Sequence, residues 1–296
     1  MTLELRPPRR EDAAAIVEAI GRFSLPDETA GDIEAWFDVP SNDLERDARI
    51  AVLGDGAAGY ADVSDASSGG KILWADVRAD RDVAPVLLDF VEGRARELAS
   101  DGARIKIWSP EQNEDWQALL DARGYRFDHY SFRMWIGLEE EMAEPELPEG
   151  IAVRTYRRDE DEAAVYKTHQ ETFSQNRNFS PDPFDDWCHW SYRDPFDPEL
   201  WFVAEADEEI AGIALCRPES AGDPTLAWIN IIGVRKSWRG RGLGSALLRH
   251  ALREFRVRGK VRAGLGVDGE NAGAIRLYER AGMKRERTFV WYQRAV

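Results

Sequence analysis

A glycine-rich turn near the C-terminus has the composition of an anion-binding site. An apolar run at 226–234 leads into basic residues, then into three glycines within 240–244, and then into an amphipathic helical pattern from Ser245. Such a turn points successive backbone N–H groups at one spot, with the positive end of the helix dipole behind them. Glycine lets the backbone approach a phosphate closely. The composition therefore predicts a pyrophosphate cradle at 235–245.

Two common nucleotide-binding loops do not fit this segment. The Walker-type loop of NTPases is excluded because no Gly-Lys-Ser/Thr triplet follows the glycines. The dinucleotide motif Gly-x-Gly-x-x-Gly is incomplete, since Ser245 stands where its last glycine would be. The alternative is a tight strand-to-helix connection that binds no ligand.

The charge around the turn favours a ligand. Residues 235–262 contain ten Lys or Arg and one acid, Glu254, in a chain whose formal net charge is −16. Arg256 and Arg258 are placed to offset the dipole at the C-terminal end of the helix. Four other basic residues lie at the N-terminal end, where that explanation fails; they are Arg235, Lys236, Arg239 and Arg241. Phosphate groups would account for these four.

A second segment adds to this pattern. A short helix is expected to begin at Asn271, a good N-cap residue, and to carry Tyr278. Arg239-x-x-Gly242-x-Gly244 after a Gly-Val strand end resembles the acetyl-CoA signature of the GNAT superfamily of N-acetyltransferases. The segment that begins at Asn271 resembles the second motif of that family. Both motifs occur in order on one strand–helix–strand–helix unit.

The resemblance implies an N-acetyltransferase that uses acetyl-CoA as co-substrate, needs no metal and acts on a small-molecule amine. In the family the amine attacks the thioester carbonyl directly, without an acyl-enzyme. Tyr278 is then the acid for the departing thiolate, because a phenol of pKa ~10 can protonate a thiolate whose conjugate acid has pKa ~8.5. The other reading of Tyr278 is a half-buried helix aromatic. The residues implied to contact acetyl-CoA are Ile232, Gly233, Val234, Arg239, Gly240, Arg241, Gly242, Leu243, Gly244, Ser245 and Asn271.

No general base is evident in the sequence. Asn230 is the one polar side chain on the central strand 226–234, where many relatives carry an acid. The other candidates, each also explained as a surface or structural residue, are Glu171, His169, His189 and Asp194. A chain of water molecules is an equal alternative.

The acceptor is expected to lie against residues 173–187. The acids Asp182, Asp185 and Asp186 in this aromatic-rich stretch would attract an amine, although a solvated loop with aromatic anchors has the same composition. The alternative to an enzyme is a non-catalytic acyl-CoA-binding or regulatory protein.

The chain also contains an internal repeat, which organises the whole sequence. The matched blocks, in order, are 3–16 with 151–165, 48–63 with 200–215, and 105–113 with 263–271. Strands and helices mixed in this way indicate an α/β fold. We expect two tandem GNAT-like domains, each a mixed central sheet flanked by helices, at 1–138 and 151–296, joined by an acidic, Pro-bearing linker at 139–150. The layout is similar to that of mycothiol synthases, but the acceptor stretch gives no basis for assigning their substrate.

The first copy of the anion loop is eroded. Residues 77–88 contain no glycine and carry Asp80 and Asp82 where phosphates would lie. Leu120 stands where Tyr278 stands in the second copy. We therefore expect the first half to be a pseudo-domain and acetyl-CoA to bind at 151–296 alone.

Composition excludes several other classes of protein. The 296 residues include 55 acids and 39 Lys or Arg, which argues against a protein that coats nucleic acid or an anionic membrane. No apolar run approaches the ~20 residues of a membrane span, and the charged N-terminus does not have the core of a signal peptide. Cys188 and Cys216 have no zinc-ligand spacing and are expected to be small buried hydrophobes. The composition is that of a cytoplasmic protein, and it indicates no oligomeric state.

Overall fold

The computed structural model describes residues 2–23, 28–65, 69–140, 144–177, 179–207 and 209–296. The chain forms two compact units. The N-terminal unit comprises Met1–Tyr130, Ser180–Trp190 and Thr288–Val296, and the C-terminal unit comprises Ser131–Phe179 and Ser191–Arg287. The domain boundaries that the sequence repeat predicts, 1–138 and 151–296 with a linker at 139–150, remain a prediction. No helix in the described part of the chain combines the length and hydropathy that a membrane span needs.

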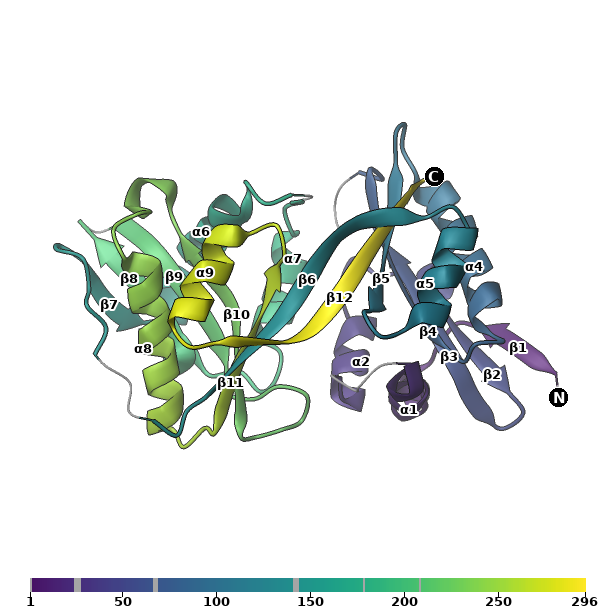
Figure 1. Ribbon diagram of the computed structural model, residues 1–296, viewed down its shortest axis with the longest axis horizontal. Helices are drawn as coiled ribbons and strands as arrows, with labels where there is room; N and C mark the ends of the chain where they lie inside the picture. The colour runs from purple at the N-terminus through teal and green to yellow at the C-terminus, as the bar shows by residue number, and fades with distance from the viewer. Residues whose placement is uncertain (1, 24–27, 66–68, 141–143, 178, 208) are drawn as a thin grey trace. The chain divides into compact units, whose positions relative to one another are not determined.

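The N-terminal unit is an α/β structure in which helices cover a mixed sheet (Figure 1). Its elements are β1 (Leu3–Arg6), η1 (Arg10–Asp12), α1 (Ala13–Phe23), α2 (Ala30–Phe37), α3 (Leu44–Asp47), β2 (Ala48–Leu53), β3 (Gly56–Ser64), β4 (Ile72–Ala79), α4 (Ala84–Leu98), β5 (Arg104–Pro110) and α5 (Glu114–Ala122). Strands β1 to β4 pair antiparallel in chain order, and β4 pairs in parallel with β5.

The C-terminal unit repeats this order. Its elements are β7 (Ala152–Thr155), α6 (Arg158–Phe173), η2 (Pro198–Leu200), β8 (Trp201–Ala206), β9 (Glu209–Arg217), β10 (Leu226–Val234), η3 (Lys236–Trp238), α8 (Leu243–Val257), β11 (Arg262–Asp268) and α9 (Ala272–Arg280). Strands β7 to β10 pair antiparallel in chain order, and β10 pairs in parallel with β11. The α/β fold with a mixed sheet in each half is therefore confirmed.

The two long final strands are exchanged between the units. Strand β6 (Arg126–Gly137) ends the first half of the chain, yet its residues 131–137 pair antiparallel with β11 of the C-terminal unit. Strand β12 (Lys284–Ala295) ends the second half, yet its residues 289–295 pair antiparallel with β5 of the N-terminal unit. Helix α7 (Phe184–Tyr192) likewise belongs mainly to the N-terminal unit. The repeat in the sequence did not predict this exchange.

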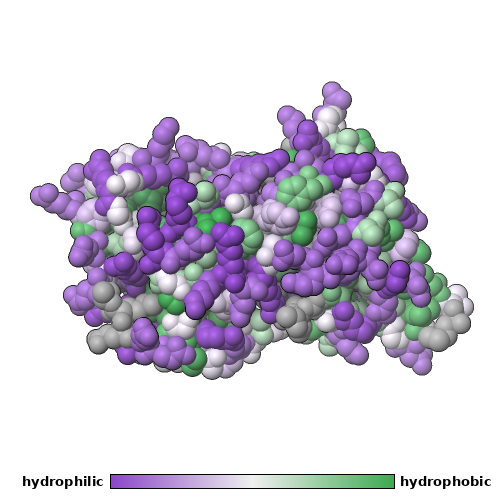
Figure 2. Space-filling view, in the orientation of Figure 1, coloured by the Kyte–Doolittle hydropathy of each residue, from purple (hydrophilic) through white to green (hydrophobic). Residues whose placement is uncertain are grey.

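Helices α6 and α8 pack on opposite faces of the C-terminal sheet. A Cβ atom at Gly212 would lie 3.1 Å from the Cδ1 atom of Leu247 in α8, and one at Gly233 would lie 2.4 Å from the Oγ1 atom of Thr172 in α6. Figure 1 shows α8 and α9 in front of this sheet and α6 behind it. The buried apolar stripe of α8 is the one that the helical spacing predicts. The surface drawn in Figure 2 is mostly hydrophilic.

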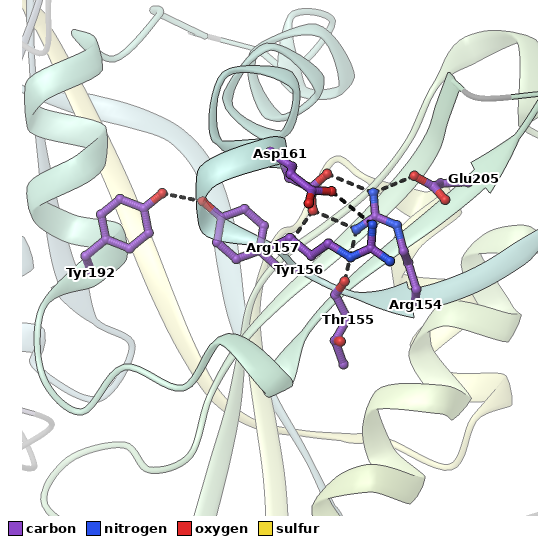
Figure 3. Close-up of polar contacts among 8 residues, drawn as sticks. Arg154, Thr155, Tyr156, Arg157, Asp161, Tyr192 and Glu205 are labelled. Atoms are coloured by element: carbon purple, nitrogen blue, oxygen red, sulfur yellow. Dashed lines mark hydrogen bonds and ion pairs between the residues drawn. The ribbon is translucent and has the colours of Figure 1, made fainter.

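A cluster of charged side chains stabilises the connection between β7 and α6 in the C-terminal unit. Both Nη atoms of Arg154 donate to the carboxylate of Asp161, at 2.6 and 2.8 Å, and Glu205 accepts from the same guanidinium. The Asp161 carboxylate also accepts from the backbone N–H of Arg157 at 2.7 Å, as Figure 3 shows. These hydrogen bonds fix the entry of the chain from β7 into α6.

The same cluster recurs in the N-terminal unit. Arg6 donates two hydrogen bonds of 2.7 Å to Asp12, and the backbone N–H of Arg9 donates to Asp12 at 2.6 Å. Arg6 occupies the place of Arg154 in the aligned blocks, and Asp12 occupies that of Asp161 once the one extra residue of the second block is allowed for. A bidentate Arg–carboxylate pair has a demanding geometry, so its recurrence supports the internal repeat at the level of side chains.

Candidate active site

The two central strands of the C-terminal sheet part from each other. β10 and β11 pair in parallel as far as Ile229 and Leu265. Beyond these residues, β10 continues to Val234 beside β9, and β11 continues to Asp268 beside β6. The edges of β10 and β11 that face each other after this point therefore carry backbone groups that the described sheet does not use.

A β-bulge lies where the strands part. The register between β10 and β9 shifts between Ile229 and Ile231, so Asn230 is the extra residue. Asn230 is exposed although it belongs to a central strand. A bulge bends its strand and turns a side chain out of the regular pleat. The corresponding pair β3–β4 keeps one register along its whole length.

The end of β10 presents free backbone donors to the opening. The N–H of Arg235 donates to the carbonyl of Ala211, at 2.9 Å, on the β9 side. Because backbone groups alternate in direction along a strand, Gly233 also faces β9, whereas Ile232 and Val234 face away from it. Two backbone N–H groups are thus directed into the gap between β10 and β11, where an extended ligand can pair with them.

The N-terminus of α8 is open. Gly242 is its N-cap residue, with φ +90°, and Gly240 has φ +76°. Ala246 donates to the Gly242 carbonyl at 3.0 Å, which is the first hydrogen bond of the helix. The N–H groups of residues 243–245 precede it and point out of the helix end. A glycine cap has no side chain to accept from them, so this end has the geometry of an anion site.

The corresponding helix end in the N-terminal unit is closed. The carbonyl of Asp80 accepts from the N–H groups of Val83 and Ala84, at 2.9 and 3.0 Å. Pro85 has no N–H, and Val86 donates to the carbonyl of Val83 at 3.0 Å. The donors that would hold a phosphate are therefore already used.

The register of the N-terminal sheet corrects one detail of the sequence comparison. Gly59 pairs with Ala79, as Gly212 pairs with Val234. The sequence alone places Val77 opposite Val234, ten positions before Leu87. The register places Ala79 there instead, eight positions before Leu87, because β4 has no bulge and ends two residues later.

Charged and aromatic side chains bridge the parted strands of the N-terminal unit. The indole N–H of Trp108, on β5, donates to Asp76, on β4, at 3.1 Å. The buried guanidinium of Arg78 contacts Asp76 at 2.7 Å and Glu28 at 3.0 Å. Both strands have passed their last mutual pair at this point. The place that stays open in the C-terminal unit is thus taken by side chains here.

Two of the four basic residues expected at phosphates are used by the protein itself. The Nε atom of Arg235 lies 3.1 Å from a carboxylate oxygen of Glu171. Arg239 donates to three protein oxygens. Lys236 is exposed, and the Arg241 guanidinium lies 4.7 Å from the ring centre of Trp238. The cations at the loop that remain for phosphates are therefore Lys236 and Arg241.

Asn271 and Tyr278 occupy one face of α9, two turns apart. The Asn271 side chain accepts from the N–H of Ala274 at 3.1 Å, which confirms its role as N-cap. Tyr278 is 6% exposed, and burial raises the pKa of its phenol to about 12. Within the described chain the structure shows no hydrogen bond from its hydroxyl. The phenol therefore stays protonated at neutral pH and has a free donor.

The candidate bases are mostly engaged elsewhere. Glu171 pairs with Arg235, as described, and the Nε2 atom of His189 lies 2.6 Å from the carbonyl of Ala35. Asp186, one of the acids expected to attract an amine, instead accepts from the N–H and the hydroxyl of Ser41. These two contacts anchor α7 in the N-terminal unit.

Burial lowers the pKa of His169 to about 4, so this imidazole is neutral at pH 7. Because its ordinary pKa is about 6.5, the unfolded chain binds a proton at this residue before the folded chain does. Stability from this group is complete above pH 6.5 and is lost as the pH falls toward 4. In the wild type, this residue should lower the free energy of unfolding by about 2 kcal/mol between pH 8 and pH 5. His169→Leu should lack this part of the pH dependence. Urea unfolding at both pH values measures this, and an unchanged difference would contradict it.

The sequence did not reveal three features of the site: the bulge at Asn230, the contacts of Arg239 and the close approach of Thr172. A glycine among β-branched residues, Gly233, was the one available signal of the approach. The described residues contain no group of three or more His, Cys, Asp or Glu side chains that could hold a metal ion.

Comparison with known proteins agrees with this geometry. The acetyltransferase (GNAT) family model matches residues 162–283, which include the open end of α8 and the helix that carries Tyr278. Residues 162–283 belong to the GNAT family of acetyltransferases. The family resemblance of the two sequence motifs is thereby confirmed.

Relatives extend the similarity beyond the matched segment. The chain is 29% identical over 198 residues to a mycothiol acetyltransferase of Saccharopolyspora erythraea, a match that covers 66% of this chain and 64% of that protein, which is less than two thirds of its length. It is 29% identical over 254 residues to a mycothiol acetyltransferase of Thermobispora bispora, covering 83% and 84%.

Solved structures show the same fold over the whole chain. A GCN5-related N-acetyltransferase from Sphaerobacter thermophilus has a TM-score of 0.79 at 29% identity and covers 99% of this chain and 95% of its own. A tandem GNAT protein from the clavulanic acid biosynthesis pathway has a TM-score of 0.73 at 16% identity, and the match covers 99% of this chain and 98% of that chain. At this identity the similarity concerns the fold and not the function. Two tandem GNAT-like halves are therefore confirmed as the fold.

Proposed function

We propose that this GNAT protein transfers the acetyl group of acetyl-CoA to the amine of a small molecule, at the parted strands of the C-terminal unit. The observation that carries this proposal is the open N-terminus of α8 beside the unpaired edge of β10. The first supplies N–H donors for the diphosphate, and the second supplies donors for an extended amide chain such as pantetheine. Lys236 and Arg241 are placed for the remaining phosphate.

The chemistry follows from these positions. The neutral amine attacks the thioester carbonyl, and a C–N bond forms while the C–S bond breaks. Of the two free backbone N–H groups, at Ile232 and Val234, one pairs with the pantetheine chain and the other stabilises the charge on the carbonyl oxygen. The thiolate takes a proton from Tyr278, and the amine releases its proton to water. With Glu171 and His189 engaged and His169 buried, water is the base that this site favours.

A small acceptor suits this chain better than a macromolecule. The relatives at 29% identity are named mycothiol acetyltransferases, after a small molecule. A net charge of −16 disfavours a nucleic acid. The second candidate is a non-catalytic acyl-CoA-binding protein. It is supported by the lack of an acidic side chain on β10 that could act as the base, since the exposed polar residue there is Asn230. Release of free thiol from acetyl-CoA with a panel of primary amines separates the two.

We expect one acetyl-CoA per chain by calorimetry, because the helix end in the N-terminal unit has no donors to spare. Gly242→Asp should abolish binding, since it puts a carboxylate at the N-H groups of residues 243–245. Gly259→Asp is the matched control: Gly259 has φ +76°, and a Cβ at either glycine has nothing within 4 Å.

The control places the same change beyond the C-terminal end of α8, with similar backbone strain. It should cost stability while leaving the affinity for acetyl-CoA within a few-fold of wild type. Two equivalent sites, or equal loss of binding in both variants, would overturn the assignment of the site to the N-terminus of α8.

A further inference from the structure

The side chain of Arg239 joins three parts of the C-terminal unit. Its Nε atom donates to the carbonyl of Val234 at 2.9 Å, at the end of β10. Its Nη2 atom donates to the carbonyl of Thr172 at 3.1 Å, in the last turn of α6. Its Nη1 atom donates to the Oε1 atom of Gln175 at 3.1 Å, in the turn that follows α6. Each of the three guanidinium nitrogens thus donates to one protein oxygen, although the side chain as a whole is exposed.

The end of α6 explains why a cation is held here. The last carbonyls of a helix have no partner within it and lie at the negative end of its dipole. The last turn of α6 contains no basic residue of its own. Arg239 supplies that charge from the glycine-rich loop, and its planar fork reaches several oxygens at fixed angles, which a lysine cannot do.

The turn at 174–177 is held from a second side. The Nη1 atom of Arg177 lies 2.7 Å from the Oε1 atom of Glu270. Glu270 immediately precedes Asn271, the N-cap of α9. The turn therefore contacts both the loop that precedes α8 and the loop that precedes α9. These two loops lie on either side of the gap between β10 and β11.

We propose that Arg239 is a positioning residue that couples acetyl-CoA binding to the turn at 174–177, and that it is not a ligand of the phosphates. This inference rests on the proposed function, which places acetyl-CoA against residues 243–245. A ligand that orders the loop also orders the turn through Arg239. By linkage, an ordered turn strengthens acetyl-CoA binding by the same factor. The turn begins the segment expected to face the acceptor, so the first substrate prepares the site of the second.

Charge-conserving substitutions test which role Arg239 has. If it acted as a phosphate charge, Arg239→Lys would keep most of the affinity for acetyl-CoA. We expect instead that Arg239→Lys and Arg239→Gln both weaken binding roughly tenfold, because one ammonium nitrogen cannot span the oxygens that the fork reaches from three separate nitrogens. Arg241 is the matched control from the same loop. Its guanidinium is expected at a phosphate, so Arg241→Lys should bind nearly as well as wild type and Arg241→Gln should not.

Hydrogen exchange of the turn tests the coupling without a known acceptor. The N–H of Asn176 donates to the carbonyl of Phe173 at 2.8 Å, so its exchange reports opening of the turn. Acetyl-CoA should slow this exchange in the wild type but not in Arg239→Lys. Gln175→Met removes one contact of Arg239 and leaves the other two. Because the coupling is reciprocal, it should lose protection of the turn and affinity for acetyl-CoA by matching factors.

The outcomes separate this inference from the proposed function. A wild type that fails to bind acetyl-CoA overturns both. A wild type that binds, with Arg239→Lys showing normal affinity and normal protection of the turn, overturns the positioning role alone. If Arg239→Lys does not fold, Gln175→Met decides: retained protection of the turn contradicts the coupling.

Discussion

Tyr278→Phe is expected to lower kcat by ~10²-fold, within the range of a single acid–base group. The substitution keeps the buried ring and removes the hydroxyl. Because no hydrogen bond from that hydroxyl is seen in the described chain, the free energy of unfolding and the affinity for acetyl-CoA should change little. Steady-state kinetics should show kcat and kcat/KM falling together, which marks an interaction made mainly in the transition state.

The raised pKa of Tyr278, about 12, defines how the residue acts. A phenol of this pKa is a weaker acid than a thiol, so its hydroxyl first donates a hydrogen bond to sulfur that strengthens as charge develops there. The proton moves to sulfur only as the C–S bond breaks, and Tyr278 then regains a proton from water. It remains protonated at every pH well below 12. The activity of the wild type should therefore not fall through ionisation of Tyr278 at moderately alkaline pH.

Tyr125→Phe is the matched control for this prediction. Tyr125 is fully buried in the N-terminal unit, and its hydroxyl is also without a hydrogen-bond partner among the described residues. Losing this hydroxyl should leave kcat unchanged. An undiminished kcat in Tyr278→Phe, with the chemical step shown to limit the rate, would falsify the acid role and leave Tyr278 as a helix aromatic.

Local sequence was sufficient for the features that depend on neighbouring residues. Asn271 caps α9 as predicted, because this role depends on the backbone of one turn. Gly240 and Gly242, the glycines expected at the anion-binding turn, have positive φ. Helix α8 begins at Leu243, two residues earlier than the start at Ser245 that the apolar pattern predicts. The glycines of this turn have no side chains, so they add nothing to the pattern that would mark the start.

Features that depend on distant partners were not predictable. Arg239 has the charge of a phosphate ligand, and it contacts Thr172 and Gln175, in a helix and its following turn more than sixty residues away. The exchange of β6 and β12 has the same origin. The two strands are copies of one repeat, so the sequence of either one is compatible with β5 or with β11.

The exchange of strands gives the second large effect, on fragments of the chain. Residues 146–296 contain the whole matched family segment but lack β6. The edge of β11 from Arg262 to Asp268 would then lose its partner. The core would lose Met134, which is fully buried, and an unpaired apolar edge promotes aggregation. Loss of one such side chain alone costs about 2–5 kcal/mol. We expect this fragment to be insoluble.

A longer fragment, 126–296, is the matched control because it restores β6. It should be more soluble than 146–296, although β12 still lacks β5, and it should bind acetyl-CoA, since the open end of α8 and the edge of β10 are complete within it. It still lacks Ser41 and Ala35, which hold α7 through Asp186 and His189. Turnover of the amine should therefore fall more than the affinity for acetyl-CoA. Solubility, circular dichroism and calorimetry of both fragments measure this. A soluble 146–296 fragment that binds acetyl-CoA normally would mean that β12 can fold back into the place of β6, and that the first half is not needed for folding.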